Sequence, residues 1–204
     1  MKRSYVLLGF CIWAMFIARA QIVTTNPAFP IEGKAVTLIF DAAQGTAGLK
    51  GYTGDVYAHT GVITDQSEKE SDWRYASDWN VNVAKYKMTS LGNNKWELNI
   101  TPDVRSYYGV PAGEKILKMA FVFRSSDGKK EGKDTGGKDI FVDIHETGLT
   151  VRFDQPSGIA TLNSGETLAM KASASMVADM KLFVGNEPIA TQSNVKEITA
   201  EHTF

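Results

Sequence analysis

Apolar residues recur at every second position in four stretches of the chain. These runs cover residues 36–40, 56–59, 96–100 and 117–123. Because successive side chains of a β-strand point to opposite sides, a period of two predicts strands that are buried on one face only. The pattern therefore predicts an all-β protein rather than a helical one.

Turn-forming residues separate these runs. Gly92, Asn93 and Asn94 predict a hairpin turn across residues 91–95, between a strand at 86–88 and the strand that begins at Trp96. One short helix is also predicted. Thr101 would be its N-cap and Pro102 its first residue, and it would end near Gly109 after crossing between two sheets.

A second series of short strands follows a joint at residues 146–148. We expect strands at residues 149–153, 167–172, 180–184, 188–192 and 198–204. The predicted fold is an antiparallel β-sandwich over residues 21–145, followed by an immunoglobulin-like β-sandwich over residues 146–204. An immunoglobulin-like domain needs about seven strands and about 100 residues. The second sandwich is thus expected to be truncated, with downstream domains of the same polypeptide beyond it.

The N-terminus has the pattern of a secretory signal peptide. A basic start, Met1-Lys2-Arg3, precedes an apolar run over residues 5–17 and the small-residue site Ala18-Arg19-Ala20. This run is shorter than the roughly 20 residues of a membrane-spanning helix. We predict that residues 1–20 are removed and that the protein is secreted through the Sec pathway to the periplasm, the cell surface or the medium.

Composition and charge exclude several classes of protein. Apolar residues make up 43% of the chain and charged residues 22%, with a net charge of −1. This balance disfavours a disordered chain and a nucleic-acid binder. Without Lys2, Arg3 and Arg19 the basic residues fall from 22 to 19 against 23 acidic ones, a net charge of −4. The predicted mature chain also loses Cys11, the only cysteine, so we expect no disulfide, no thiolate metal site and no cysteine nucleophile. No cofactor is expected either.

The densest aromatic and polar segments are residues 54–61 and 71–80. If Val56 and Ala58 face the core, their strand neighbours face outward, and the loop that follows adds further rings. Exposed rings beside hydrogen-bonding side chains suit sugars, because a pyranose places its apolar face on a ring while its hydroxyls bond polar groups. Alternatively, one or both loop tryptophans fill the core, as we expect of Trp96. The candidate binding residues here are Tyr57, His59, Trp73, Tyr75 and Trp79.

The loop over residues 125–139 is polar and glycine-rich. It lacks the spacing of a calcium loop and the helix context of a phosphate loop, so it is either a solvated hairpin or a contributor of Asp134 and Lys138 to the rim of a ligand site. The sequence also lacks the His-Glu-x-x-His and Gly-x-Ser-x-Gly motifs of hydrolases. We therefore expect no catalysis by this chain.

Several of these motifs together resemble a known family. The segment 55–61, then Trp73 and Trp79, then Trp96 after a Gly-Asn turn, and finally the segment 132–142 are similar to starch-binding carbohydrate-binding modules of families 25 and 26. The opening at residues 24–30 resembles that of secreted α-amylase-family proteins of Bacteroidetes.

The resemblance implies a non-catalytic region that binds α-glucan, either starch or maltooligosaccharide. It implies an aromatic platform of Tyr57, His59 and Trp73, with Trp79 and Tyr75 as further candidates, and a downstream α-amylase-family catalytic domain. Two other interpretations stay open: a structural spacer without a ligand, and a host-glycan or peptide adhesin.

Overall fold

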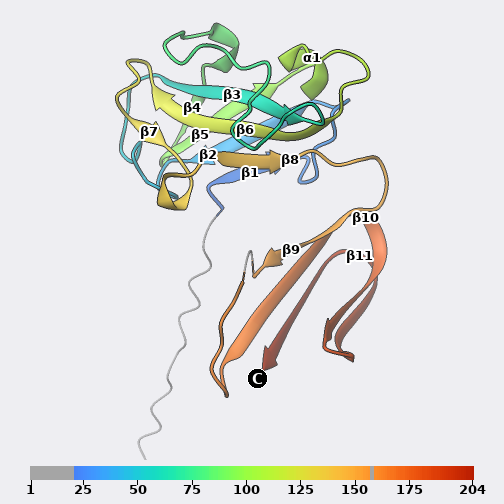
Figure 1. Ribbon diagram of the computed structural model, residues 1–204. Helices are drawn as coiled ribbons and strands as arrows, with labels where there is room; N and C mark the ends of the chain where they lie inside the picture. The colour runs from blue at the N-terminus through green and yellow to red at the C-terminus, as the bar shows by residue number, and fades with distance from the viewer. Residues whose placement is uncertain (1–20, 157–158) are drawn as a thin grey trace, which may run out of the picture.

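The regular structure of the described residues is almost entirely antiparallel β-strand, as predicted. The computed structural model describes residues 21–156 and 159–204, so the predicted signal peptide at residues 1–20 lies outside the described residues. Two units follow one another along the chain (Figure 1): a two-sheet sandwich that ends near His145, and a smaller unit built around one long hairpin. The all-β fold class is confirmed.

The first sheet of the sandwich contains four antiparallel strands. Their order across the sheet is β1-β2-β5-β4. The strands are β1 (Val23–Asn26), β2 (Val36–Asp41), β4 (Thr89–Gly92) and β5 (Lys95–Ile100). The predicted hairpin turn is present between β4 and β5, where Asn93 and Asn94 both take positive φ angles. Residues 86–88 are not a strand: Tyr86 ends a short 3₁₀ helix, η1 (Ala84–Tyr86), and Lys87 forms only an isolated bridge with Tyr57.

The second sheet is organised around one long central strand. It contains β3 (Val56–Thr64), β6 (Ile116–Ser125), β7 (Glu131–Gly132) and β8 (Ile140–Asp143). β3 pairs with one side of β6, and both β7 and β8 pair with its other side, at different stretches. β6 therefore forms the middle of this sheet along its whole length.

Large aromatic side chains join the two sheets. Phe40 of β2 and Phe123 of β6 stack with their ring centroids 4.0 Å apart, and both are fully buried. Gly132 of β7 lies against the same ring, because a Cβ at this position would be 2.4 Å from Phe40 Cζ. Each buried ring of this kind contributes roughly 1.5–3 kcal/mol relative to an exposed one. The predicted core residues Val56, Ala58 and Trp96 are all buried here.

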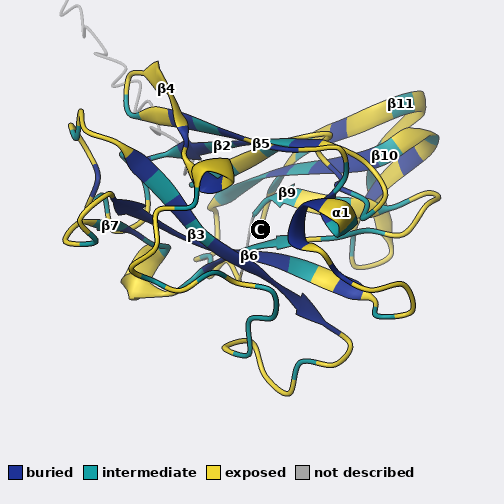
Figure 2. Cartoon of the chain, turned by 90° about the horizontal axis from the view of Figure 1, so that it is seen from above, coloured by how far each residue is buried: buried dark blue, intermediate teal, exposed yellow. Residues whose placement is uncertain are grey.

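From Met119 onward β6 is buried on both faces, which the alternating pattern did not predict (Figure 2). Ala120 and Val122 alternate with the core residues Met119, Phe121 and Phe123 and so point away from the sandwich core, yet both are buried. The reason is a cover loop, residues 65–83, which follows β3. Its residue Arg74 makes two backbone hydrogen bonds with Val62 of β3, of 2.8 and 3.0 Å.

The one α-helix among residues 21–156 and 159–204, α1 (Val104–Tyr108), begins later than predicted. Asp103 is its N-cap instead of Thr101, because the Asp103 carboxylate accepts a hydrogen bond of 2.8 Å from the Ser106 backbone N–H. The helix ends at Gly109, whose φ of 75° is the left-handed conformation expected of a C-cap glycine. The predicted crossing between the sheets is confirmed, since α1 connects β5 to β6.

The second unit has three strands where the sequence suggested five. They are β9 (Val151–Gln155), β10 (Thr167–Val184) and β11 (Glu187–Thr203), in the order β11-β10-β9. β10 unites the two strands expected at 167–172 and 180–184, and β11 unites the other two. The pairing slips between Ser173 and Met180, where the hairpin bends.

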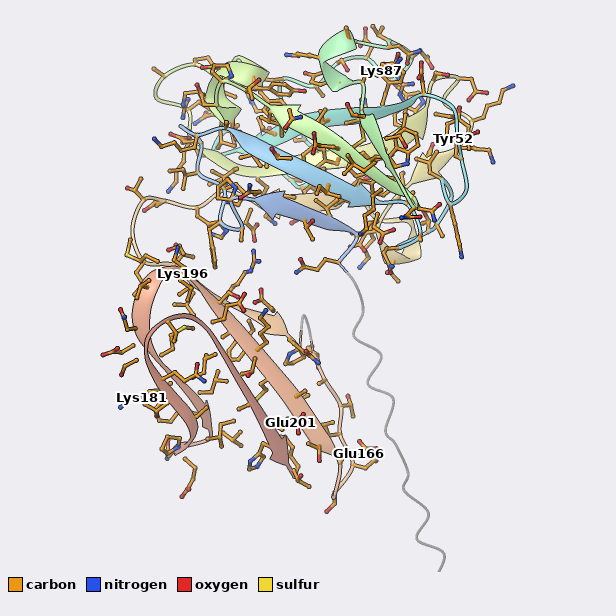
Figure 3. The ribbon with its side chains drawn as sticks, turned by 180° about the vertical axis from the view of Figure 1, so that it is seen from behind. Tyr52, Lys87, Glu166, Lys181, Lys196 and Glu201 are labelled. Atoms are coloured by element: carbon orange, nitrogen blue, oxygen red, sulfur yellow. The ribbon has the colours of Figure 1, made fainter. Side chains whose placement is uncertain are left out.

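This bend gives the second unit its own small core. Figure 3 shows Lys196 near the bend, Lys181 on one arm, and Glu166 and Glu201 at the far end of the other arm. Apolar side chains from both arms are buried together: Met170, Ala172, Ala174, Met180, Leu182 and Ile198. On the β9 side, by contrast, Val151 and Phe153 are more than half exposed. The immunoglobulin-like assignment of this unit stays a prediction.

A compact contact joins the two units. The Arg152 guanidinium of β9 lies 4.7 Å from the ring centroid of Phe29 and donates a hydrogen bond of 2.8 Å to the Ala28 carbonyl. His145, at the end of the first unit, packs edge-on against Phe29, with the two ring centroids 5.2 Å apart. Phe29 is thereby buried between the units.

Candidate functional site

Four of the predicted aromatic and histidine side chains lie on one surface. Tyr57 and His59 occupy alternate positions of β3 whose side chains point away from the sandwich core. Trp73 and Trp79 come from the cover loop, which lies over the same outer surface of the β3-β6-β8 sheet. A Cβ at Gly61 would be 2.8 Å from the Arg74 carbonyl oxygen, so glycine at this position lets the loop approach the strand.

His59 is at the centre of this group. Its ring stacks on Trp73, with centroids 5.5 Å apart and planes 24° apart, and it meets Trp79 at 71° and 4.9 Å. Trp73 in turn contacts Phe141 of β8, with centroids 6.4 Å apart. We call Tyr57, His59, Trp73, Trp79 and Phe141 the aromatic face; all five side chains are half-buried.

Arg124 of β6 connects Tyr57 to this group. Its guanidinium carbon lies 5.7 Å from the Tyr57 ring centroid and 5.6 Å from that of Trp79. The side chain is buried and donates hydrogen bonds to Asn82 Oδ1 at 2.8 Å and to the Val81 carbonyl at 2.9 Å. Arg124 therefore fixes the end of the cover loop to the sheet, while its Nε has no hydrogen-bond partner among the described residues.

The angles between the rings define the shape of the aromatic face. The His59 ring is roughly parallel to that of Trp73 but steeply inclined to that of Trp79, and Trp73 is inclined by 75° to Phe141. The rings therefore form an angled surface and not one flat plane. His59 occupies one side of Trp73 and Arg124 lies over Trp79, so each indole can offer only its remaining surface to a ligand.

His59 is held in its neutral form. Burial lowers the pKa of this imidazole, and the nearby positive charge of Arg124 lowers it further, while Asp139 opposes both effects. Nδ1 is buried without a hydrogen-bond partner among the described residues. Any hydrogen bond from His59 to a ligand must therefore use Nε2.

Charged side chains border the Phe141 end of the aromatic face. Lys118 Nζ lies 5.4 Å from the Phe141 ring centroid and pairs with Glu70 of the cover loop at 2.7 Å. This hydrogen bond and charge lower the pKa of the Glu70 carboxyl, and Lys138 adds a smaller effect in the same direction. The predicted rim residue Lys138 thus lies near this border, where it is exposed.

The other predicted rim residue, Asp134, serves its own loop. Its carboxylate accepts a hydrogen bond of 2.7 Å from the Thr135 backbone N–H and caps a single turn, η2 (Thr135–Gly137). Its backbone N–H donates to the Lys138 carbonyl at 2.8 Å. Asp139 is the acidic residue of this loop whose charge reaches His59.

Tyr75 does not join the aromatic face. It takes a positive φ of 57°, and its hydroxyl donates a 2.5 Å hydrogen bond to Glu114 Oε2. Thr64 and Arg74 also bind this carboxylate, and the three interactions lower the pKa of Glu114. Tyr75 therefore anchors the cover loop beside the sandwich core, where it is partly buried.

Sequence reasoning missed Arg124 and Phe141. Arg124 directly follows the apolar run 119–123, and that context is its available signal, since a charged side chain seldom occurs in a buried strand unless it is paired. For Phe141 the sequence predicts only that it lies in a strand. Its outward direction depends on the register between β8 and β6, which pairs it with Ala120.

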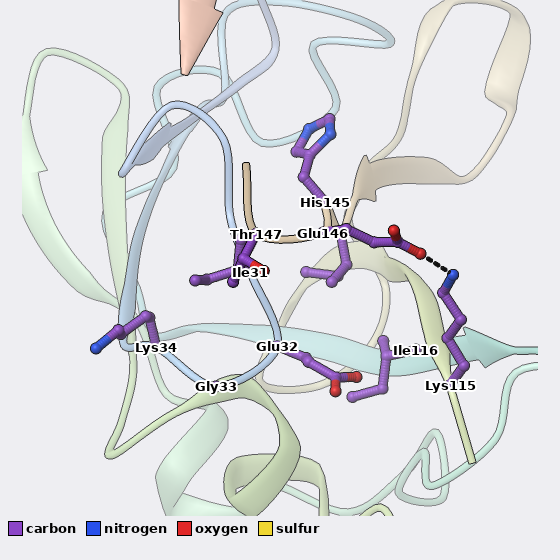
Figure 4. Close-up of a pocket in the computed structure, with 10 residues that line it drawn as sticks. Ile31, Glu32, Gly33, Lys34, Lys115, Ile116, His145, Glu146 and Thr147 are labelled. Atoms are coloured by element: carbon purple, nitrogen blue, oxygen red, sulfur yellow. Dashed lines mark hydrogen bonds and ion pairs between the residues drawn. The ribbon is translucent and has the colours of Figure 1, made fainter. Parts of the chain in front are cut away.

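A separate cavity lies at another end of the sandwich (Figure 4). It measures about 600 Å³ and lies between the turn after β1 and the segments that flank β6 and β8. Lys115 and Glu146 pair across it, and Lys34 points away from them. Its walls contain acidic, basic and isoleucine side chains, and this mixture does not indicate one class of ligand.

Metal and membrane sites find no support in the described parts of the chain. Among residues 21–156 and 159–204, no group of three potential ligands could hold a metal ion. No helix within the same residues is both long and apolar enough to cross a membrane.

These features define a two-sheet β-sandwich that presents an angled aromatic surface, partly built by a loop, on one sheet. Residues 23–131 match the model of a family described as a domain of unknown function, DUF8578. Since this match covers more than half of the chain, the protein belongs to that family. The matched region includes both cover-loop tryptophans and ends before β8, which supplies Phe141. No curated protein matches the sequence.

Proposed function

We propose that the first sandwich is a non-catalytic glycan-binding module that holds α-glucan, such as starch or maltooligosaccharide, on the aromatic face. The single observation that supports this proposal most strongly is the gathering of Tyr57, His59, Trp73 and Trp79 on one half-exposed surface. These residues come from two separate segments, and the same residues carry the resemblance to starch-binding modules.

The chemistry of the surface suits a neutral sugar. Ring faces accept the apolar side of a pyranose, and aromatic residues with a polar group can also hydrogen-bond its hydroxyls. Tyr57 and His59 supply such groups, and His59 is uncharged at neutral pH. The inclination between the rings suits a chain whose successive sugars turn relative to one another, as α-1,4-linked glucoses do, better than a flat crystalline polymer.

Such a module would serve as an accessory to an α-amylase-family catalytic domain. Tethering to starch raises the local concentration of substrate at a linked enzyme without any new catalytic contact. We also propose that the chain is exported after removal of residues 1–20. Sequencing of the mature N-terminus would then begin at Gln21.

Affinity electrophoresis tests the proposed binding. The purified protein should migrate more slowly in a native gel that contains amylopectin than in a plain gel. Trp73→Ala should remove most of this retardation, because it deletes the ring between His59 and Phe141. Phe183→Ala is the matched control, since it deletes a ring that is 53% exposed on the second unit.

Two results would count against the proposal. Unretarded migration of the wild-type protein in amylopectin would overturn it. Equal retardation of wild type and Trp73→Ala would place any binding elsewhere on the molecule. Circular dichroism of each variant would confirm that the sandwich remains folded.

A structural spacer is the second candidate, and one observation favours it. The rings contact one another and Arg124, so they could serve only to attach the cover loop to the sheet. This alternative expects no glycan binding and a loss of stability in Trp73→Ala. A host-glycan adhesin would instead bind other sugars on a glycan array while ignoring amylopectin.

A further inference from the structure

We propose that the glycan track continues beyond the aromatic face into a groove between the two units, so that this protein binds an extended oligosaccharide through both. This inference rests on the proposed function and names the form of its ligand. It assigns a second, polar subsite to the junction of the units.

Phe141 makes the two surfaces continuous. On one side its ring contacts Trp73 of the aromatic face. The same residue lines a groove of about 210 Å³ at the junction of the units. In Figure 1, β8 and β1 run beside each other along the edge of the sandwich that faces the second unit. A ligand that passes over Phe141 therefore leads directly toward this groove.

The groove has mainly polar walls. Thr24 and Thr25 come from β1, Asp143 from the end of β8, and Arg152 from β9 of the second unit. Asp143 and Thr24 are exposed. Hydroxyls, a carboxylate and a guanidinium together offer both acceptors and donors, which is the complement that sugar hydroxyls require.

Arg152 is already held in position. Its Nε pairs with Asp154 at 2.8 Å, and one terminal nitrogen donates to the Ala28 carbonyl. The Phe29 ring lies beneath the guanidinium. A side chain fixed in this way loses little conformational freedom on binding, so its interactions with a ligand are less offset by entropy.

The volume of the groove decides what it can hold. Pockets for whole small ligands measure about 300–1,000 Å³. At about 210 Å³, this groove is too small for a complete oligosaccharide. It fits the end of a sugar chain whose other residues lie on the aromatic face. Long chains should therefore bind more tightly than short ones.

Titration calorimetry with maltotriose and maltoheptaose tests this arrangement. The wild-type protein should bind maltoheptaose more tightly than maltotriose. Asp143→Ala should weaken maltoheptaose binding about tenfold, the effect of losing one hydrogen bond to a charged group. Maltotriose, which can be held on the aromatic face alone, should lose much less.

Thr24→Val provides a second variant that keeps the shape and strand preference of the side chain while deleting its hydroxyl. It should also weaken maltoheptaose binding more than maltotriose binding. Glu187→Ala is the control, because it removes an exposed carboxylate at the tip of the β10–β11 hairpin.

The failures of the two proposals are distinguishable. If the wild-type protein binds neither sugar, the proposed function is wrong, and this inference is wrong with it. If the wild type binds both sugars and Trp73→Ala abolishes binding, but Asp143→Ala and Thr24→Val match the wild type on maltoheptaose, only the extended track is overturned. Equal wild-type affinity for the two sugars would overturn the extended track as well.

Discussion

At the scale of single residues, the buried cation Arg124 is the most consequential side chain of the aromatic face. It is 2% exposed and lies between two rings while it binds the cover loop through Val81 and Asn82. Burial lowers the pKa of this guanidinium, because its charged form loses solvation in the folded protein. Its hydrogen bonds and ring contacts must therefore offset that cost.

Replacement of Arg124 by methionine should destabilise the protein by about 2 kcal/mol. Three hydrogen bonds from a charged group are lost, to Asn82 Oδ1 and to the Val81 and Ser125 carbonyls. Each contributes about 1.5–3 kcal/mol, and relief of the desolvation cost returns most of this. Urea denaturation followed by tryptophan fluorescence measures the change. Lys196→Met, on the exposed surface of β11, should be neutral. A stability of Arg124→Met equal to wild type would contradict the role assigned to this residue.

Side-chain direction was predictable where a strand continued without interruption. Alternation in β3 correctly separated buried Val56 and Ala58 from outward Tyr57 and His59, because a period of two leaves only two choices. The same reasoning could not place Tyr75. Its position depends on a left-handed backbone conformation and on Glu114, which is 39 residues away in the sequence.

At the scale of elements, β10 shows where the local pattern of apolar residues does not predict the structure. Apolar residues recur in β10 before and after the bend between Ser173 and Met180, but the bend interrupts their alternation. In the sequence, a break of this kind cannot be distinguished from a turn, so the pattern predicts two short strands. The long hairpin is decided by pairing with β11, a non-local interaction that one segment does not encode.

The start of α1 offers a test at this scale. Asp103→Ala should lower the free energy of unfolding by about 1 kcal/mol, because it deletes the carboxylate that caps the helix. Hydrogen bonds from the backbone N–H and the hydroxyl of Ser106 lower the pKa of Asp103. Its stabilising effect is therefore present above the normal carboxyl pKa and is lost as the pH falls through the lowered value.

Chemical denaturation at pH 7 and at pH 3 checks this expectation. The difference between wild type and Asp103→Ala should be clear at pH 7 and should shrink at pH 3. Thr101→Ala, at the position predicted first as the cap, should have little effect. A larger loss for Thr101→Ala than for Asp103→Ala would contradict the observed cap.

At the scale of the whole molecule, the junction between the units sets their relative orientation. Phe29 is enclosed by Arg152 and His145, one from each side of the joint. Burial lowers the pKa of His145, the charge of Arg152 lowers it further, and Asp143 partly opposes this. His145 is thus neutral at neutral pH, which avoids a second positive charge beside Phe29.

Arg152→Ala should loosen this joint while leaving each unit folded. The variant loses the hydrogen bond to Ala28 and the cation over the Phe29 ring, which together cross the boundary between the units. Small-angle scattering should report a broader distribution of inter-unit distances, and far-ultraviolet circular dichroism should remain unchanged. Lys171→Ala, which leaves the junction intact, is the control. A scattering profile identical to wild type would show that other contacts define the orientation.

The cover loop has a consequence for the motions of the sandwich. Because β6 is paired on both edges and covered on both faces, its amides can reach solvent only through the opening of a large part of the unit. In hydrogen exchange its protons should be the last of the described chain to be replaced by deuterium. The amides of β9, which has exposed apolar side chains and pairs on one edge only, should exchange far earlier. The protein thus combines a slowly opening domain with a more labile neighbour, and its proposed ligand would lie across the boundary between them.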